Sequence, residues 1–425
     1  MVKKNTVGKE KIEAIFDAGT FVELGALVKR GLESEDYEGV LCGYGAVRGK
    51  LTYAFVQDGD RMRGAFDERH AKKIERLYEL ALKGGAPVVG VFDSLGALVY
   101  EGAAALSGYG RIMRCVSGAS GIIPQIAVID GACSGSSEVI ASMFDVVIAV
   151  KGEKEEKFAS RVAENRAQAF EYAAELVSML PSNNAEGTVV DVSYDDLNRK
   201  VAIDGKSAKD ALAAIADDGK VIELYEGFGA EVKTALVSLG GVVCGAVAAD
   251  GKLTAGGARK ASKLVSFCDS FHIPVITLVN SEGLDAEENL AGELARLAHA
   301  YALADTAKIT VVVGAAYGAS FTLLGSKSLG ADVVFALESA EISVLPPDVS
   351  VAFLWNDKIT HEKSREQVEA EWKEKCSSAI YAAELGEVDD IIASDELRQR
   401  ICACVSMLFA KAEGVPSRKH INMPL

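Results

Sequence analysis

The chain has 425 residues, enough for two ordinary domains that each bury a hydrophobic core of their own. Apolar residues make up 49% and charged residues 25%, which is typical of a globular protein and excludes a disordered or fibrous one. The net charge of −16 argues against a general nucleic-acid binder or a protein that adheres to membrane surfaces.

The chain carries no recognisable targeting signal. Its first residues, MVKKNTVGKEKIEAIF, are charged throughout and lack the apolar region of a secretory signal. Residues 309–326 are uncharged, but their glycines and hydroxyl side chains favour buried core over a membrane span. The eight cysteines are scattered without a C-x-x-C pair, so neither a zinc ribbon nor a disulfide framework is expected. We predict a cytoplasmic protein, which partner subunits could hold at a membrane.

Two landmarks of the first half of the chain return in the second half. The sequence FVEL at 21–24 is matched by VIEL at 221–224. A proline-started apolar run at 85–96 ends in a polar pair and a glycine, and residues 272–283 repeat that order. Such self-similarity at a fixed spacing indicates an internal repeat.

Two further landmarks follow in the same order. An apolar run leads into GACSGSS at 131–137, and another leads into GAAYGAS at 314–320. A helical segment comes next, and then Asp-Val-Val, which begins at Asp145 in the first copy and at Asp332 in the second. Strand, glycine turn, helix and strand in this order predict a β-α-β unit in each copy.

The segment between the copies marks a domain boundary. LPSNN at 180–184 contains a proline and two asparagines, which break helices. We therefore predict two α/β domains, residues 1–185 and residues 186–425. Chance similarity between two α/β halves is the alternative, and the shared order of four landmarks disfavours it.

The two glycine turns are the candidate functional elements. A strand that turns through glycine into a helix leaves backbone N–H groups without acceptors, and glycine lets a ligand approach them closely. Such groups bind phosphate or stabilise an oxyanion. Neither turn has a P-loop or G-x-G-x-x-G pattern, so we favour oxyanion stabilisation. Close packing alone is the alternative explanation, and it suits a single turn better than a matched pair.

Side-chain catalysis finds little support in the sequence. No H-E-x-x-H, G-x-S-x-G or clustered His/Cys ligand set occurs, so no metal site is predicted. A reaction driven by backbone N–H groups needs none of these. The histidines are His70, His272, His299, His361 and His420.

Together these features resemble the carboxyltransferase subunits of biotin-dependent acyl-CoA carboxylases and decarboxylases. The family includes the propionyl-CoA carboxylase β subunit and the α subunits of methylmalonyl-CoA and glutaconyl-CoA decarboxylases. The resemblance runs from about residue 19 to the end of the chain. It rests on the segments 21–24, 93–97 (DSLGA), 108–111 (GYGR), 118–124, 131–137, 180–184, 267–274 (FCDSFHIP), 316–318 (AYG), 325–327 (GSK), 330–332 (GAD) and 419–425 (KHINMPL).

The resemblance implies two tandem crotonase-like domains, of which the first binds acyl-CoA and the second binds biotin. It also implies a homo-oligomer, commonly a hexamer, in which the active site forms between domains of different subunits. The family's mechanism needs two oxyanion holes, because the enolate of the acyl-CoA and the ureido oxygen of biotin both carry negative charge. The holes correspond here to the backbone amides of Gly135 and Ser136, and of Ala319 and Ser320.

The same matching assigns the binding residues. Those expected at the acyl-CoA are Ser94, Gly96, Ala97 and Gly131, and those expected at biotin are Tyr317, Gly318 and Thr322. The chain lacks a Met-Lys-Met biotinylation motif and an ATP-binding domain. The resemblance therefore implies a biotin carboxyl carrier protein as a separate chain, together with a biotin carboxylase or a membrane decarboxylase subunit.

Three positions depart from the family's pattern. Ser136 stands in place of a second glycine, Leu98 in place of an arginine, and Thr322 in place of an acidic residue. The departures at Leu98 and Ser136 keep open the alternative of a non-catalytic scaffold subunit. A crotonase-like acyl-CoA enzyme without biotin is a separate alternative. The direction of the reaction, carboxylation or decarboxylation, depends on the partners.

Overall fold

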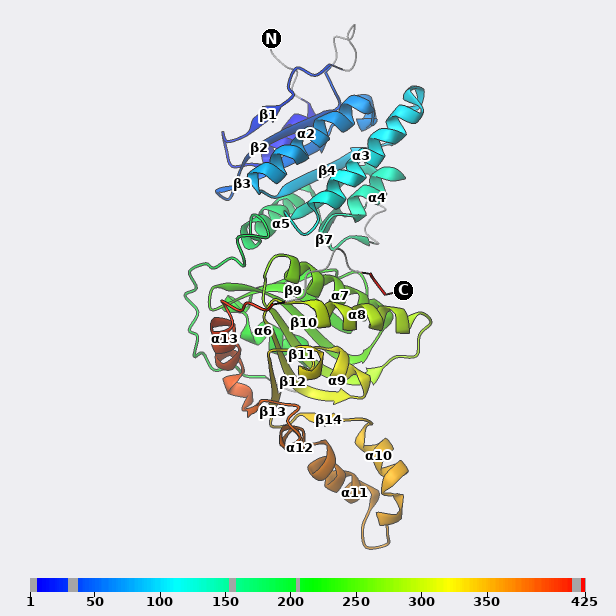
Figure 1. The fold of residues 1–425 in the computed structure, drawn as a ribbon, viewed down its shortest axis with the longest axis vertical. Helices are drawn as coiled ribbons and strands as arrows, with labels where there is room; N and C mark the ends of the chain where they lie inside the picture. The colour runs from blue at the N-terminus through cyan, green and yellow to red at the C-terminus, as the bar shows by residue number, and fades with distance from the viewer. Residues whose placement is uncertain (1–5, 30–36, 153–157, 204–206, 415–421, 425) are drawn as a thin grey trace. The chain divides into compact units, whose positions relative to one another are not determined.

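The computed structural model describes residues 6–29, 37–152, 158–203, 207–414 and 422–424. Of the closing KHINMPL segment, residues 419–421, which include His420, and residue 425 lie outside the described residues. The chain divides into two compact units, residues 1–189 and 190–425 (Figure 1). The predicted boundary at 185/186 falls in the segment 180–189, which has neither helix nor strand.

Unit 1 contains one sheet, in which the described strands lie in the order β1-β2-β3-β4-β5-β6-β7. The strands β1, β2 and β3 are antiparallel neighbours, and from β3 to β7 the neighbours are parallel. The helices and strands are α1 (Val7–Ile15), β1 (Val22–Leu24), β2 (Val40–Val47), β3 (Lys50–Gln57), α2 (Glu68–Gly84), β4 (Val88–Ser94), α3 (Ala103–Ala119), β5 (Gln125–Cys133), α4 (Ser136–Ser142), β6 (Val146–Val150), β7 (Arg161–Ala163) and α5 (Arg166–Met179).

Unit 2 repeats this order with the sheet β8-β9-β10-β11-β12-β13-β15, and the additional strand β14 pairs with β12. Its elements are α6 (Ala208–Ile215), β8 (Val221–Leu224), β9 (Val232–Leu239), β10 (Val242–Leu253), α7 (Ala255–Ser270), β11 (Val275–Leu284), α8 (Leu290–Leu303), β12 (Lys308–Tyr317), α9 (Ala319–Leu323), β13 (Val333–Leu337), β14 (Glu341–Ser343), α10 (Pro347–Leu354), α11 (Arg365–Trp372), α12 (Ala379–Glu384), β15 (Asp390–Ile392) and α13 (Leu397–Met407). The predicted α/β class is confirmed.

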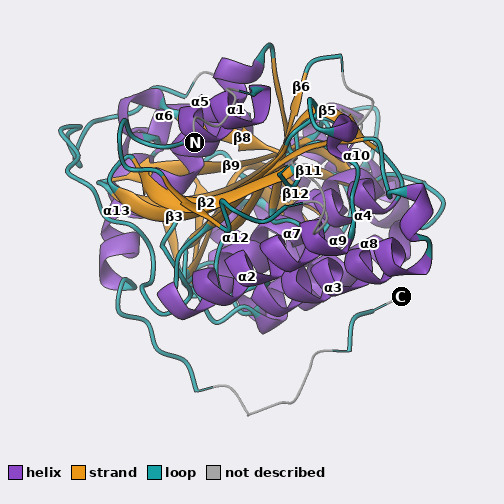
Figure 2. Ribbon diagram, turned by 90° about the horizontal axis from the view of Figure 1, so that it is seen from above, coloured by secondary structure: helices purple, strands orange, loops and turns teal. Residues whose placement is uncertain are grey.

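Helices cover both faces of each sheet. In unit 1, α2 and α3 lie side by side on one face, and α1 and α5 lie on the other (Figure 1 and Figure 2). In unit 2, α7 and α8 lie side by side, and α6 and α13 pack on the opposite face. The parallel strands are therefore buried on both sides, which explains their nearly continuous apolar sequences.

Helix α2 illustrates how the sequence produces this packing. The side chain of its N-cap Asp67 accepts a hydrogen bond from the His70 N–H, and Gly85 ends the helix in the left-handed conformation. Its buried positions recur at a spacing of three and four residues, so one face is turned to the sheet. They include His70, Ala71, Ile74, Leu77, Tyr78 and Ala81.

The register of the strands makes the two units comparable residue by residue. Val88 pairs with Gln125 in unit 1, and Val275 pairs with Lys308 in unit 2. In both units the pairing slips shortly after this point, between Phe92 and Ser94 in β4 and between Val279 and Ser281 in β11. The same bulge thus stands at the carboxyl end of the equivalent strand.

Unit 2 also contains a helical segment that has no counterpart among the described residues of unit 1. Helices α10 and α11 enclose a small core of their own, in which the Trp355 and Trp372 rings meet edge to face at 4.8 Å.

No helix of the described residues is both long and apolar enough to cross a bilayer. The uncharged residues 309–326 belong largely to β12 and α9.

One aspartate in each unit fastens the hairpin between the antiparallel strands. Asp17 accepts hydrogen bonds from the N–H groups of Arg48 and Gly49, at 3.0 and 2.8 Å. Asp217 accepts the equivalent pair from Gly240 and Gly241. In unit 2 alone, Arg398 also lies 2.7 Å from Asp217, and its guanidinium is fully buried.

Replacing Asp217 by alanine should therefore destabilise unit 2 by about 3–5 kcal/mol, because the buried Arg398 loses its closest counter-charge. The matched control is Asp17→Ala, which removes the same pair of hydrogen bonds at an exposed position and should cost much less. Hydrogen exchange at increasing urea concentrations would report the stability of each unit separately. Equal losses in both variants would contradict the role given to Arg398.

Candidate functional site

The glycine turns of the two units have the same backbone conformation. Gly135 has φ 59° and ψ −123°, and Gly318 has φ 59° and ψ −138°. Only glycine adopts this conformation without strain, because any side chain would clash with its own backbone. Space is not the reason in the first turn, since a Cβ atom on Gly135 would meet nothing within 4 Å. Both turns therefore require glycine for the direction in which the chain leaves the strand.

Each turn leads directly into a short helix. Ser136 is the first residue of α4, and Ala319 is the first residue of α9. Within the part of the chain that the structure describes, neither of their N–H groups has a protein acceptor. Ala319 is exposed and Ser136 is partly exposed. The N–H groups of Ser136 and Ala319 thus remain available to a ligand, as expected at the start of a helix. Ser320, the other predicted donor of unit 2, is fully buried.

The two predicted donor pairs begin at different positions relative to the glycine of the turn. The first pair includes the glycine itself, Gly135, whereas the second pair begins after Gly318, at Ala319. In unit 2 the Gly318 N–H donates to the Ser343 carbonyl at 2.9 Å, because β14 lies beside β12. In the described part of unit 1 no strand takes that place, and the Gly135 N–H has no protein acceptor. This difference agrees with the two predicted pairs, of which the first is Gly135 with Ser136 and the second begins at Ala319.

The hydroxyl groups that follow are turned inward. Ser320 is fully buried, and its Oγ donates to the Tyr317 carbonyl at 2.7 Å. The equivalent Ser137 is buried as well, with its Oγ 3.2 Å from the Tyr109 hydroxyl. The side chains of Ser320 and Ser137 thus brace the turns from inside and do not face a ligand.

Of the predicted acyl-CoA residues, Ser94 and Gly131 lie at the ends of the neighbouring strands β4 and β5, of which β5 leads into the first turn. The register brings Ser94 opposite Cys133, and the buried Ser94 hydroxyl accepts the Gly96 N–H at 3.2 Å. Ala97 forms an isolated bridge with Phe66. Ser94 and Ala97 therefore shape the loop that passes beside the turn.

Gly131 serves the first turn by close packing. Its φ is 149°, and a Cβ atom there would lie 2.2 Å from Oδ1 of Asp93. The carboxylate of Asp93 thus occupies the space that any side chain at 131 would need. Gly131 differs in this respect from Gly135, where the space is open.

Tyr109, on α3, contacts the residues behind the first turn, and the sequence did not reveal this contact. Its ring stacks on Phe66 with centroids 4.1 Å apart. Burial raises the pKa of the Tyr109 phenol, although hydrogen bonds with Ser137 and Ser94 act in the opposite direction. Tyr109 therefore stays neutral and holds the two serines together. Helical periodicity places it on the buried face of α3, but only the fold shows what it contacts.

The predicted biotin residues gather at the second turn. The Tyr317 hydroxyl donates to Oε2 of Glu341 at 2.7 Å, and the Lys373 ammonium lies 3.3 Å from the other oxygen of that carboxylate. Burial and the neighbouring Glu341 charge raise the pKa of Tyr317, so its phenol remains protonated. Thr322 is exposed on α9, one turn of helix beyond Ala319.

The sequence matches the family model of the carboxyl transferase domain over residues 3–156 and 157–423. The chain belongs to the carboxyl transferase family. A methylmalonyl-CoA decarboxylase α subunit from Propionigenium modestum is 32% identical, over 98% of this chain and 93% of its own length. A propionyl-CoA carboxylase β chain from Saccharopolyspora erythraea is 30% identical, over 100% of this chain and 91% of its own.

A solved structure of the family has the same fold. The crystal structure of a transcarboxylase 12S hexamer, with methylmalonyl-coenzyme A and methylmalonic acid bound, superposes with a TM-score of 0.91. The two sequences are 29% identical, and the match spans 99% of this chain and 93% of the transcarboxylase chain. The prediction of two tandem crotonase-like domains is confirmed.

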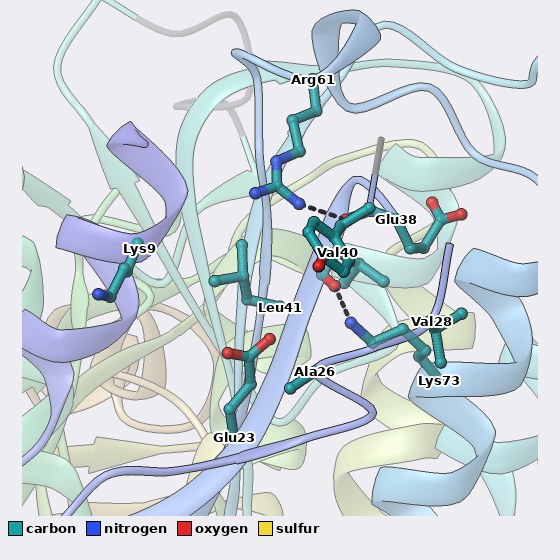
Figure 3. Close-up of a pocket in the computed structure, with 10 residues that line it drawn as sticks. Lys9, Glu23, Ala26, Val28, Glu38, Val40, Leu41, Arg61 and Lys73 are labelled. Carbon is teal, nitrogen blue, oxygen red and sulfur yellow. Dashed lines mark hydrogen bonds between the residues drawn. The ribbon is translucent and has the colours of Figure 1, made fainter. Parts of the chain in front are cut away.

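Unit 1 of this carboxyl transferase contains a small cavity, and neither glycine turn lines it. It has room for a single water molecule, about 10 Å³. Arg61 donates to the Glu38 carbonyl on one side of it, and the Lys73 ammonium donates to the Val40 carbonyl on the other (Figure 3). No predicted site residue is among the described residues that line it, so we regard it as part of the interior.

Proposed function

We propose that this chain is the carboxyltransferase subunit of a biotin-dependent acyl-CoA carboxylase or decarboxylase. The observation that carries the proposal is the pair of glycine turns with one backbone conformation, each of which offers backbone N–H groups without protein acceptors. The names of the relatives, a methylmalonyl-CoA decarboxylase α subunit and a propionyl-CoA carboxylase β chain, support it. So does the methylmalonyl-coenzyme A in the similar structure.

The turn of unit 1 binds the acyl thioester in this proposal. Loss of the proton from the carbon next to the thioester places negative charge on the thioester oxygen. The N–H groups of Gly135 and Ser136 stabilise that charge, and one such donor typically contributes about 2.7–4 kcal/mol. In carboxylation, a carbon–carbon bond would form to the carboxyl carbon as the bond between that carbon and the biotin nitrogen breaks, and the proton would pass to the biotin nitrogen. Decarboxylation would exchange the same bonds in reverse. Ser94, Gly96, Ala97 and Gly131 shape the surroundings of the acyl group.

The turn of unit 2 fits the ring oxygen of biotin. The exposed start of α9 offers N–H donors, and the neighbouring Gly318 is held by Ser343. Bound biotin supplies or accepts the carboxyl group. Ala319 and Ser320 would hold its ureido oxygen through their N–H groups, with Tyr317 and Thr322 beside the ring.

The proposal requires further chains. A biotin carboxyl carrier protein must bring the biotin, and a biotin carboxylase or a membrane decarboxylase subunit must complete the reaction. We also propose a cytoplasmic location, which agrees with the fact that all eight cysteines are free.

The central test is carboxyl exchange between malonyl-CoA or methylmalonyl-CoA and free biotin, with neither metal nor ATP added. Labelled carboxyl groups should pass between the two, because backbone donors alone provide the stabilisation. The label is followed by separating the CoA esters from biotin. A well-folded oligomer that exchanges with none of several short dicarboxylic CoA esters would favour the scaffold alternative.

Proline substitutions separate backbone from side-chain catalysis. Ser136 and Ala319 are first residues of helices, a position that tolerates proline, so Ser136→Pro and Ala319→Pro remove one N–H each while the fold persists. Exchange should fall about 10²–10³-fold in each. Ser136→Ala and Ser320→Ala keep the N–H groups and should stay within about tenfold of the wild type. Circular dichroism and sedimentation serve as folding controls, and a folded but inactive Ser136→Ala enzyme would refute the backbone mechanism.

We further propose that the chain is an obligate homo-oligomer, a hexamer like the similar transcarboxylase structure. The helical segment of unit 2 exposes large apolar side chains, among them Val344 at 81% and Phe353 at 78% exposure. Clustered exposure of this kind is typical of a subunit interface. Sedimentation at micromolar concentration should show the oligomer, and a stable active monomer would contradict the proposal.

A further inference from the structure

A buried ionic network lies behind the first turn. Lys11, on α1, is only 1% exposed. Its ammonium lies 2.8 Å from Oδ2 of Asp93 and 3.0 Å from Oδ2 of Asp130, and it donates to the Asp130 carbonyl at 2.8 Å. Arg166, at the start of α5, contacts the same oxygen of Asp130 from the outside. One buried cation thus bridges two carboxylates from neighbouring strands.

Unit 2 provides an internal comparison for the two carboxylates. Because Gln125 and Lys308 occupy equivalent positions in the register, Asp130 corresponds to Val313, and Asp93 corresponds to Asn280. Val313 is fully buried in the core of unit 2. Neither position carries a charge there.

The lysine has an uncharged counterpart too. Asp58 accepts the Gly8 N–H at the start of α1, and Asp250 accepts the Ala208 N–H at the start of α6, which aligns the two helices. Lys11 then corresponds to Ala211, which is also fully buried. Unit 2 therefore builds the same fold with alanine, asparagine and valine at these three positions. Burying charges is costly, and apolar residues in their place usually preserve stability, so the fold alone does not account for the network.

The two aspartates of the network stand next to two of the predicted acyl-CoA residues. Asp93 directly precedes Ser94, and Asp130 directly precedes Gly131. The Asp93 carboxylate also packs against Gly131, as described above. Lys11 therefore joins β4 and β5 near their carboxyl ends, where β5 leads into the first turn and β4 leads into the loop that follows Ser94.

The two units support their turns by different means. In unit 2, Asn280 accepts the Ala315 N–H at 3.0 Å and donates to Asp250 at 2.9 Å, while β14 holds Gly318. No strand of the described part of unit 1 supports Gly135 in this way. In unit 1 the Asp93 member of the ionic network stands at the position of Asn280.

We propose that Lys11 is a positioning residue for the acyl-CoA turn. It holds Asp93 and Asp130 together and thereby fixes the direction of the Gly135 and Ser136 N–H groups. Fixed donors stabilise a developing charge without reorganisation, whereas a loosened turn loses most of that benefit. This inference rests on the proposed function, because it assigns the first turn to the acyl thioester.

The test transplants the residues of unit 2 into unit 1, as the triple variant Lys11→Ala/Asp93→Asn/Asp130→Val. Because unit 2 folds with this set, the variant should fold and keep its melting temperature near that of the wild type. The KM for methylmalonyl-CoA should rise about ten- to hundredfold, while the KM for free biotin stays unchanged. The single variant Lys11→Arg keeps the charge between the two aspartates and should therefore keep most of the affinity for the CoA ester.

Lys73→Met is the matched control, since it removes another buried lysine of unit 1 that bonds a backbone carbonyl away from the turn. It should lower the melting temperature without changing the KM for the CoA ester. A folded triple variant with an unchanged KM, or an equal rise in Lys73→Met, would overturn the inference.

Hydrogen exchange of the segment 131–140 tests the inference independently of activity. The triple variant should exchange faster there than the wild type, while the segment 314–323 of unit 2 remains unchanged. Unaltered exchange at 131–140 would overturn the positioning role even if the enzyme is active. If the wild-type protein shows no carboxyl exchange, the proposed function is refuted. The rate of hydrogen exchange at 131–140 would still decide whether Lys11 holds the turn.

Discussion

The structure depends on one constraint, the conformation of a single glycine at the end of a parallel strand. With φ near 59° at Gly135 and Gly318, the chain turns sharply and starts a helix whose first N–H group has no acceptor among the described residues. The parallel strands and the helices on both faces serve to hold that turn at the edge of the sheet. Ligands bind at this edge in α/β folds because strand ends and helix starts meet there.

The repeat shows that one turn can be supported in two ways. Unit 2 uses the uncharged side chain of Asn280, which also donates to Asp250, and the additional strand β14, whereas unit 1 uses a buried lysine between two aspartates. A charged network adds rigidity only while every member is paired. The presence of such a network in unit 1 therefore suggests that the first turn needs a rigidity that the second turn does not.

The sequence was sufficient to predict the α/β class, the internal repeat and both glycine turns, because each is encoded within a short stretch. It did not reveal Tyr109 or Glu341, whose partners come from distant elements. The Lys11 network is the clearest case, since its contacts join residues 82 and 119 positions apart. One signal was present, because Lys11 lies on the same helical face as the buried Ile12 and Ile15. A lysine on an apolar face indicates a buried counter-charge but cannot say which one.

The backbone mechanism that we propose would also accommodate the departures from the family's pattern. Ser136 replaces a glycine in the first turn, yet its N–H remains and it stands at a helix start, where serine needs no positive φ. Leu98 replaces an arginine, and it is buried, with its N–H bonded to the Phe66 carbonyl at 2.8 Å, so it fills space as a core residue would. A side-chain nucleophile would be lost by one substitution. Donors of the main chain persist as long as the glycine before them keeps the turn.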